Sequence, residues 1–142
     1  MSDVKLTGRC YCGYYQISAS AAAQTVSYCH CADCRRLSGA PVTAFAAFSA
    51  SDLTVSPDWP ETTVFPSGVK RWFCKNCGTQ LGAQYDYLAG QIYVPIGVFD
   101  QADSLAPEMH SHVDHALCWL NLNDTLPRNA GSSRAALKTA SN

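Results

Sequence analysis

The chain has 142 residues, of which 47% are hydrophobic and 15% charged, and its formal net charge is -1 at pH 7. This composition is ordinary for a globular protein, and the length suits one domain that can bury a core without disulfides. The balanced charge gives no basic surface for nucleic acid or an anionic membrane, and no apolar run is long enough to span a bilayer, so neither partner is expected.

The N-terminal stretch predicts the cellular compartment. Residues 1–8, MSDVKLTG, lack the apolar segment of a signal peptide, which favours a cytoplasmic protein. The chain carries 8 cysteines, and in a reducing compartment such a number indicates metal ligation or thiol chemistry. Cys-x-Cys pairs are also poorly placed to bridge each other. We therefore expect metal sites rather than four disulfides.

The first half of the chain predicts short strands. Residues 14–20 alternate, with Tyr15, Ile17 and Ala19 on one side, which is typical of a half-buried strand. Further strands are expected over 25–28, 42–48, 53–55 and 62–65. One or two helical turns are expected over 35–40, because Pro41 stops a helix.

The second half continues the same pattern. Strands are expected over 69–73, 81–85 and 91–98, followed by a long final strand over 109–120. Glycine and proline separate these segments, which indicates an all-β fold. From residue 128 onward little can be buried, so we expect a single domain over 1–127 and a disordered tail over 128–142.

Seven of the cysteines form three groups along the chain, namely the pair Cys10 and Cys12, the triplet Cys29, Cys31 and Cys34, and the pair Cys74 and Cys77. Each pair is followed by a glycine, which permits the tight turn that points two thiols at one ion. We expect the two pairs to form one closed tetrahedral site. Such a site would staple segments that lie about sixty residues apart and would stabilise the fold.

The triplet predicts a different kind of site. A catalytic zinc ion characteristically takes three protein ligands and leaves one position open, and thiolate ligands favour another soft ligand there, such as a sulfur-bearing substrate. Spacing alone also permits Cys29, Cys31 and Cys34 to share an ion with Cys77 or His30. A fourth protein ligand would make the site purely structural. For His30, strand alternation favours a structural or supporting role facing away from the ion.

Three motifs together resemble a known family: GRCYCG at 8–13, CHCADCRRLSGAP at 29–41 and SGVKRWFCKNCGT at 67–79. In this order, over about residues 8–127, they resemble the glutathione-dependent formaldehyde-activating enzyme family, which includes the centromere protein V group. The resemblance implies a mostly β fold, a β-tent of antiparallel sheets around a structural zinc. It also implies a carbon–sulfur lyase-type activity that adds glutathione, or a similar thiol, to formaldehyde or another small aldehyde.

The same resemblance implies two zinc ions per chain. The structural ion would be held by Cys10, Cys12, Cys74 and Cys77. The catalytic ion would be held by Cys29, Cys31 and Cys34. The alternative function is a non-catalytic, zinc-stabilised binding module, for which the fold provides an analogy only.

Three arginines are candidates for substrate binding. Arg35, Arg36 and Arg71 carry guanidinium groups, whose geometry matches a glutathione carboxylate. The alternatives are a solvated or capping role for Arg35 and Arg36 and a salt bridge for Arg71.

The last third departs from the family pattern. The histidines His110, His112 and His115 fall in this region, where only the first two have strand spacing, and an exposed or neutral packed cluster is expected rather than a metal site. Cys118 precedes Trp119, where relatives often have proline, and is expected to be a small buried residue.

Overall fold

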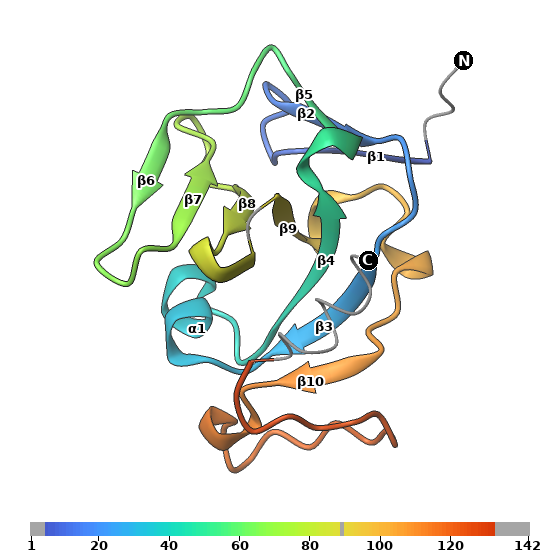
Figure 1. The fold of residues 1–142 in the computed structure, drawn as a ribbon, viewed down its shortest axis with the longest axis vertical. Helices are drawn as coiled ribbons and strands as arrows, with labels where there is room; N and C mark the ends of the chain where they lie inside the picture. Colours follow the sequence, from blue (N-terminus) through green and yellow to red (C-terminus); the bar gives the residue numbers. More distant parts are fainter. Residues whose placement is uncertain (1–4, 89, 133–142) are drawn as a thin grey trace.

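The structure is a computed structural model that describes residues 5–88 and 90–132. Its strands form two sheets (Figure 1). The smaller sheet is antiparallel, with the order β1-β2-β5, and contains β1 (Leu6–Arg9), β2 (Gln16–Ala19) and β5 (Leu53–Ser56). Ile17 of β2 lies opposite Val55 of β5, and both side chains are buried. The alternation predicted for residues 14–20 therefore points its apolar side into the core.

The larger sheet has seven strands in the order β10-β3-β4-β9-β8-β7-β6. Its strands are β3 (Thr25–Cys29), β4 (Thr43–Ser49), β6 (Thr62–Val64), β7 (Lys70–Phe73), β8 (Gln80–Gln84), β9 (Gln91–Pro95) and β10 (Met109–Ser111). The prediction of a mostly β protein is confirmed. The expectation of purely antiparallel sheets is wrong at one edge, because β10 pairs with β3 in parallel.

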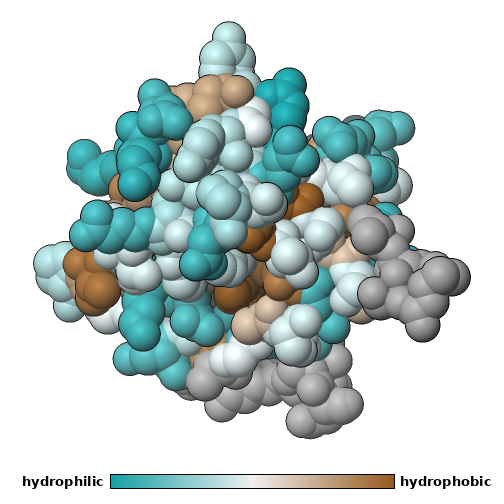
Figure 2. Space-filling model, turned by 90° about the horizontal axis from the view of Figure 1, so that it is seen from above, coloured by the Kyte–Doolittle hydropathy of each residue, from teal (hydrophilic) through white to brown (hydrophobic). Residues whose placement is uncertain are grey.

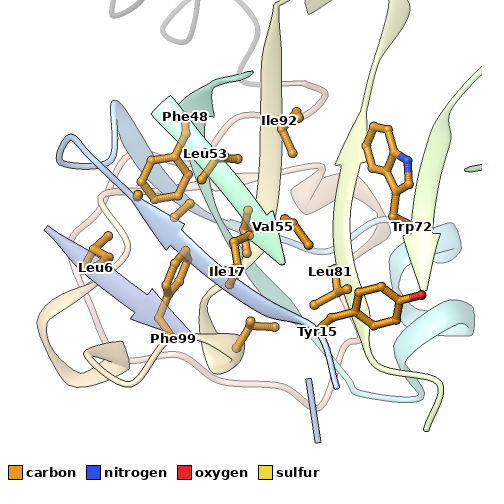
Figure 3. Close-up of a cluster of buried hydrophobic side chains, with 14 of the residues drawn as sticks. Leu6, Tyr15, Ile17, Phe48, Leu53, Val55, Trp72, Leu81, Ile92 and Phe99 are labelled. Carbon is orange, nitrogen blue, oxygen red and sulfur yellow. The ribbon is translucent and has the colours of Figure 1, made fainter. Parts of the chain in front are cut away.

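The main core lies between the two sheets (Figure 3). In the close-up, Ile17 and Val55 of the smaller sheet belong to the same buried cluster as Leu81 and Ile92 of the larger one. Phe48 packs against Phe99, with 5.6 Å between their ring centroids. The burial of these side chains, each contributing about 1.5–3 kcal/mol, accounts for the pairing of the two sheets.

The middle of the larger sheet is buried on both faces. Along β4, Ala46 and Phe48 face the main core, whereas Phe45 and Ala47 belong to a second buried cluster on the opposite face. Tyr93 of β9 belongs to the same second cluster. This explains why residues 42–48 form a nearly continuous apolar run, since a strand that is covered on both sides has no solvent-facing positions.

The final long strand predicted over 109–120 is wrong. β10 ends at Ser111 because His112 adopts a left-handed backbone conformation, with φ of 57°, which turns the chain out of the sheet. A 3-10 turn follows over Val113–His115. Likewise β9 ends at Pro95, and a 3-10 turn covers Ile96–Val98. The remaining 3-10 turns are Ala50–Asp52, Asp86–Leu88 and Ala102–Ser104.

Backbone hydrogen bonds connect the chain around residues 127–129 to β10. The amide of Asn129 donates to the carbonyl of His110 at 2.9 Å, and the carbonyl of Pro127 accepts from the amide of His110 at 2.9 Å. Asn129, in the predicted tail, therefore pairs with β10, and the domain boundary at residue 127 stays a prediction. Residues 133–142 of the predicted tail lie outside the described part of the chain.

The surface is mostly hydrophilic on the face seen in Figure 2, with small apolar patches near its centre and edge. In the ranges that the structure describes, no helix has the length and apolar character needed to cross a membrane.

Candidate metal centres

The four cysteines of the two pairs lie together. Their sulfur atoms are all within 4.8 Å of one another, although Cys10 and Cys77 are far apart in the sequence. Each pair lies on a turn that ends in a glycine with positive φ, 83° at Gly13 and 84° at Gly78. The predicted pairing of the two glycine-closed turns is therefore what the fold produces.

The geometry of this four-thiol group fits a tetrahedral zinc ion. The Sγ atoms of Cys10 and Cys12 are 3.5 Å apart, and those of Cys12 and Cys74 are 3.7 Å apart. Zinc–sulfur bonds of about 2.3 Å arranged tetrahedrally place sulfurs about 3.8 Å apart. Backbone amides also point at the sulfurs, from Tyr15 to Cys10 at 3.4 Å and from Cys12 to Cys77 at 3.5 Å.

Hydrogen bonds favour the thiolate at one of these ligands. The Thr79 hydroxyl lies 3.2 Å from Cys77 Sγ, and this contact, together with the Thr79 backbone, lowers the pKa of Cys77 to about 5. A metal ligand of this kind must be deprotonated, so Cys77 is prepared for a cation at neutral pH. In contrast, burial and the neighbouring thiols raise the pKa of Cys12 to about 11, and a cation would be needed to ionise it.

The triplet forms a second, separate group. The sulfurs of Cys29, Cys31 and Cys34 lie within 4.8 Å of one another, and the structure adds no fourth ligand from the described residues. Cys29 ends β3, and the other two lie at the start of α1 (Ala32–Ser38). Cys31 caps this helix, since its sulfur accepts from the Cys34 amide at 3.3 Å. The fold thus separates the triplet from Cys77 and does not place His30 among its ligands.

The three thiols share negative charge unevenly. Hydrogen bonds from the thiols of Cys29 and Cys34 lower the pKa of Cys31, and the same contact with Cys31 raises the pKa of Cys29. Cys29 and Cys34 are both buried. Closely packed, buried sulfurs of this kind can all be ionised only beside a cation, so the donor set fits a thiophilic metal ion such as zinc.

His30 is held by a chain of hydrogen bonds through the buried His110 to the half-buried Asp124. Its Nε2 lies 2.9 Å from Nδ1 of His110, and Nε2 of His110 lies 3.0 Å from a carboxylate oxygen of Asp124. An ionised Asp124 only accepts, so His110 donates to it and accepts from His30. Nδ1 of His30 is then left as a buried acceptor without a partner among the described residues. The expected supporting role of His30 agrees with this arrangement, and sequence reasoning missed Asp124.

The three candidate arginines have different surroundings. Arg35 donates from Nη1 to the carbonyl of His30 at 3.2 Å and contacts the carbonyl of His115. These contacts connect His30, which lies between Cys29 and Cys31 of the triplet, to His115 in the segment after β10. A structural role therefore accounts for Arg35. Arg36 is exposed, and Arg71 is buried, with no hydrogen-bond partner for its Nη1 among the residues that the structure describes. A substrate role for the arginines stays a prediction.

The remaining predicted residues lie in the segment after β10. His110 is buried, His112 is half-buried and His115 is exposed, so the three histidines do not form one cluster. Cys118 is exposed, which corrects the expectation that it is buried.

Two cavities adjoin the triplet. A cleft of about 760 Å³ contains Cys34 and also Cys10 of the four-thiol group in its lining. A much smaller cavity of about 60 Å³ contains Cys29. Phe45 lines both and therefore forms their common wall. A third cavity of about 410 Å³ is lined by residues of α1, by the turn at residues 65–67 and by Arg71.

The walls of the small cavity were missed by sequence reasoning. Tyr85, Tyr93 and Leu88 line it together with Phe45 and Ala47. The run at 42–48 was recognised as buried, but nothing in a one-dimensional pattern shows which of its faces borders a cavity.

A mostly β fold that gathers four thiols at one position and three at another defines a class of proteins whose cysteine clusters can hold two metal ions. All eight cysteines are free. The chain belongs to the glutathione-dependent formaldehyde-activating enzyme family, whose model matches residues 5–115.

A solved structure shares the fold. It is the crystal structure of a Rhodobacter sphaeroides protein, with a TM-score of 0.55 and 21% sequence identity over 86% of this chain and 98% of the other. No curated protein gave a significant match.

Proposed function

We propose that this protein joins glutathione, or a similar small thiol, to formaldehyde or another small aldehyde and forms an S-hydroxymethyl-type adduct, as a carbon–sulfur lyase. The observation that carries this proposal is the three-thiol group of Cys29, Cys31 and Cys34, which borders a large cleft through Cys34. Membership of the family supports the same activity.

The reaction is a simple addition. The thiol sulfur forms a bond to the carbonyl carbon, the π electrons of the carbonyl move to its oxygen, and that oxygen receives the proton that leaves the thiol. No group is oxidised or reduced. We propose one zinc ion on Cys29, Cys31 and Cys34 and a second on Cys10, Cys12, Cys74 and Cys77. When bound to the triplet, zinc would supply a fourth position for a soft ligand and would lower the pKa of a thiol there.

The large cleft suits the thiol substrate. Its volume of about 760 Å³ lies within the range of sites that enclose ligands of tripeptide size. Arg9 lines the cleft, and Arg36 and Arg71 lie beyond Leu37, which borders both the cleft and the third cavity. Because a guanidinium binds a carboxylate in a two-pronged geometry, Arg36 and Arg71 are the proposed partners of a glutathione carboxylate.

Aldehyde addition is fast without a catalyst, so capture and orientation are the main contribution of the protein. The chain would hold the thiol on the Cys34 side of the triplet. A reducing compartment such as the cytoplasm would keep the seven clustered thiols available for metal.

The test is metal content per chain, measured for the wild type and for Cys31→Ser, together with a titration of reduced glutathione into the cobalt-substituted protein. We expect two metals in the wild type, one in the variant, and a glutathione-dependent change in the cobalt absorption spectrum. A content of only one metal ion per chain would overturn the proposal and favour a binding module. So would a second metal ion whose cobalt absorption spectrum does not change when glutathione is added.

A further inference from the structure

The small cavity follows the surface of the larger sheet away from the triplet. Thr25, Ser27 and Cys29 alternate along β3 and all line it. Residues 25 and 29 lie about 13 Å apart along an extended strand. The cavity therefore begins at a thiol of the proposed catalytic group and runs, as a narrow channel, along one face of the sheet.

The far end of this channel is built from three adjacent strands. Ala47 of β4 lies opposite Thr25 of β3 and opposite Tyr93 of β9. The ring of Tyr85 packs against that of Tyr93, with 5.1 Å between centroids, and forms a side wall. Leu88 is buried and also lines the cavity. Hydroxyl groups and the imidazole of His112 also line the cavity, but the aromatic rings, Ala47 and Leu88 make the larger part of its surface apolar, which favours an occupant that is mainly apolar.

The volume limits what can enter. One water-sized group needs about 10–15 Å³, so a space of about 60 Å³ holds roughly four to six such groups in a row. The small cavity is thus too small for a tripeptide but larger than formaldehyde needs. Since the two cavities share only Phe45 among their lining residues, a substituent placed here would not compete with the thiol for space.

From this arrangement we infer that the channel from Cys29 to Ala47 binds the side chain of the aldehyde, and that the substrate class extends to unbranched aliphatic aldehydes with about two to four carbons beyond the carbonyl. The inference rests on the proposed function and deepens it. The carbonyl carbon would lie at the Cys29 end, next to the triplet on which the thiol would be held, and the alkyl chain would lie along the sheet.

The experiment compares aldehydes of increasing size in the zinc-loaded protein with glutathione. Adduct formation and breakdown are followed by exchange NMR for formaldehyde, propanal, butanal and benzaldehyde. The acceleration should rise by up to about fourfold for each methylene that becomes buried and should fall for benzaldehyde, whose ring is too wide. Acceleration of formaldehyde alone would overturn this inference and leave the proposed function intact. Acceleration of no aldehyde would overturn both.

Two variants on one strand give the matched comparison. Ala47→Leu adds three carbons to the channel, and the ratio of butanal to formaldehyde acceleration should fall at least tenfold, roughly the effect of two methylenes. Ala44→Leu makes the same change on β4 at a residue that lines the large cleft, and the ratio should stay near the wild-type value. An equal ratio in Ala47→Leu and wild type would contradict the inference.

A second variant and a binding measurement test the inference even if Ala47→Leu does not fold. Thr25 carries a buried hydroxyl without a partner in the described part of the chain, so the isosteric Thr25→Val should fold and should raise the same ratio about two- to fourfold. The unreactive analogue butanamide should shift the ring NMR signals of Tyr85 and Tyr93 in the wild type. Unshifted signals in the wild type would overturn the inference.

Discussion

His30 Nε2 lies 2.9 Å from Nδ1 of His110, a residue 80 positions away in the chain, and the two rings are stacked with 5.2 Å between centroids. This pair connects the loop of the three-thiol group to β10. The loop is also fastened through its backbone, since the amide of His30 donates to the carbonyl of Ser111 at 3.1 Å.

Replacing His110 by phenylalanine should destabilise the protein by about 1–3 kcal/mol, because the buried Nε2 of His30 loses its partner. Urea unfolding monitored by circular dichroism measures the change. His115→Phe is the control, since His115 is exposed, and it should stay within about 0.5 kcal/mol of the wild type. Equal stability of the two variants would contradict the role given to the histidine pair.

The pH dependence of stability should carry a contribution from Asp124. Partial burial raises the pKa of this carboxyl, but hydrogen bonds from the Leu126 amide, His110 and Arg128 outweigh it and leave the pKa lowered. A lowered folded-state pKa stabilises the protein above the unfolded value of about 3.9, and this stability is lost as the pH falls through the folded value.

The wild type should therefore lose more stability than Asp124→Asn when the pH falls from 5 to 3. Unfolding curves of both proteins at each pH give the difference, in which acid effects common to both cancel. Parallel pH profiles would show that the folded protein does not lower the pKa of Asp124.

Loss of the metal ion proposed for the four-thiol group should lower the stability of the protein more than loss of the metal ion proposed for the triplet. Cys12→Ser should lose one metal and should lower Tm sharply, because the four-thiol group joins the β1–β2 turn to the β7–β8 turn. Cys31→Ser should lose the other metal with a small change in Tm, since serine also caps a helix. Metal analysis and calorimetry of the two variants test these expectations. A lower Tm for Cys31→Ser than for Cys12→Ser would mean that the metal ion at the triplet, rather than the one at the four-thiol group, stabilises the fold.

Arg71 should stabilise metal binding at the triplet. It is a buried cation, and the salt bridges found among residues 5–88 and 90–132 do not include it. An unpaired buried charge is costly, and the thiol of Cys34 is among the groups whose pKa Arg71 influences, in the lowering direction. Arg71→Gln should weaken zinc at the second site about tenfold or more in chelator competition. Arg36→Gln, at an exposed position, is the control, and equal affinities would exclude this role.

Gly8 should tolerate no side chain. A Cβ at this position would lie 2.5 Å from the carbonyl oxygen of Val98, which is backbone and cannot move aside. Gly8→Ala should cost about 1–3 kcal/mol, whereas Gly97→Ala, where a Cβ meets no atom within 4 Å, should be neutral or slightly stabilising. Thermal unfolding of the two alanine variants checks the prediction, and similar Tm values would contradict it.

Local patterns predicted the strands and the grouping of the thiols because each depends on neighbouring residues. The alternation of Tyr15, Ile17 and Ala19 specifies a buried face, and the glycines after Cys12 and Cys77 permit the turns that carry the ligands. The cysteine spacing likewise separates two pairs from a triplet.

Features that depend on contacts between residues far apart in the sequence were not predictable from local patterns. The strand predicted over 109–120 ends early because His112 leaves the extended conformation, and its amide donates to the carbonyl of Gly131 at 2.8 Å. The contact between Asp124 and His110 and the face of β4 that borders the small cavity arise only when β3, β4, β9 and β10 are placed side by side.

The parallel pairing of β10 with β3 gives an order to the assembly of the chain during synthesis. A nascent chain has all four cysteines of the four-thiol group once Cys77 has left the ribosome, while the hydrogen bonds to His30 need residues near 110 that are made later. The N-terminal part of the chain folds first in co-translational folding. We therefore expect the three thiols of the triplet to reach their final position after the four-thiol group has assembled.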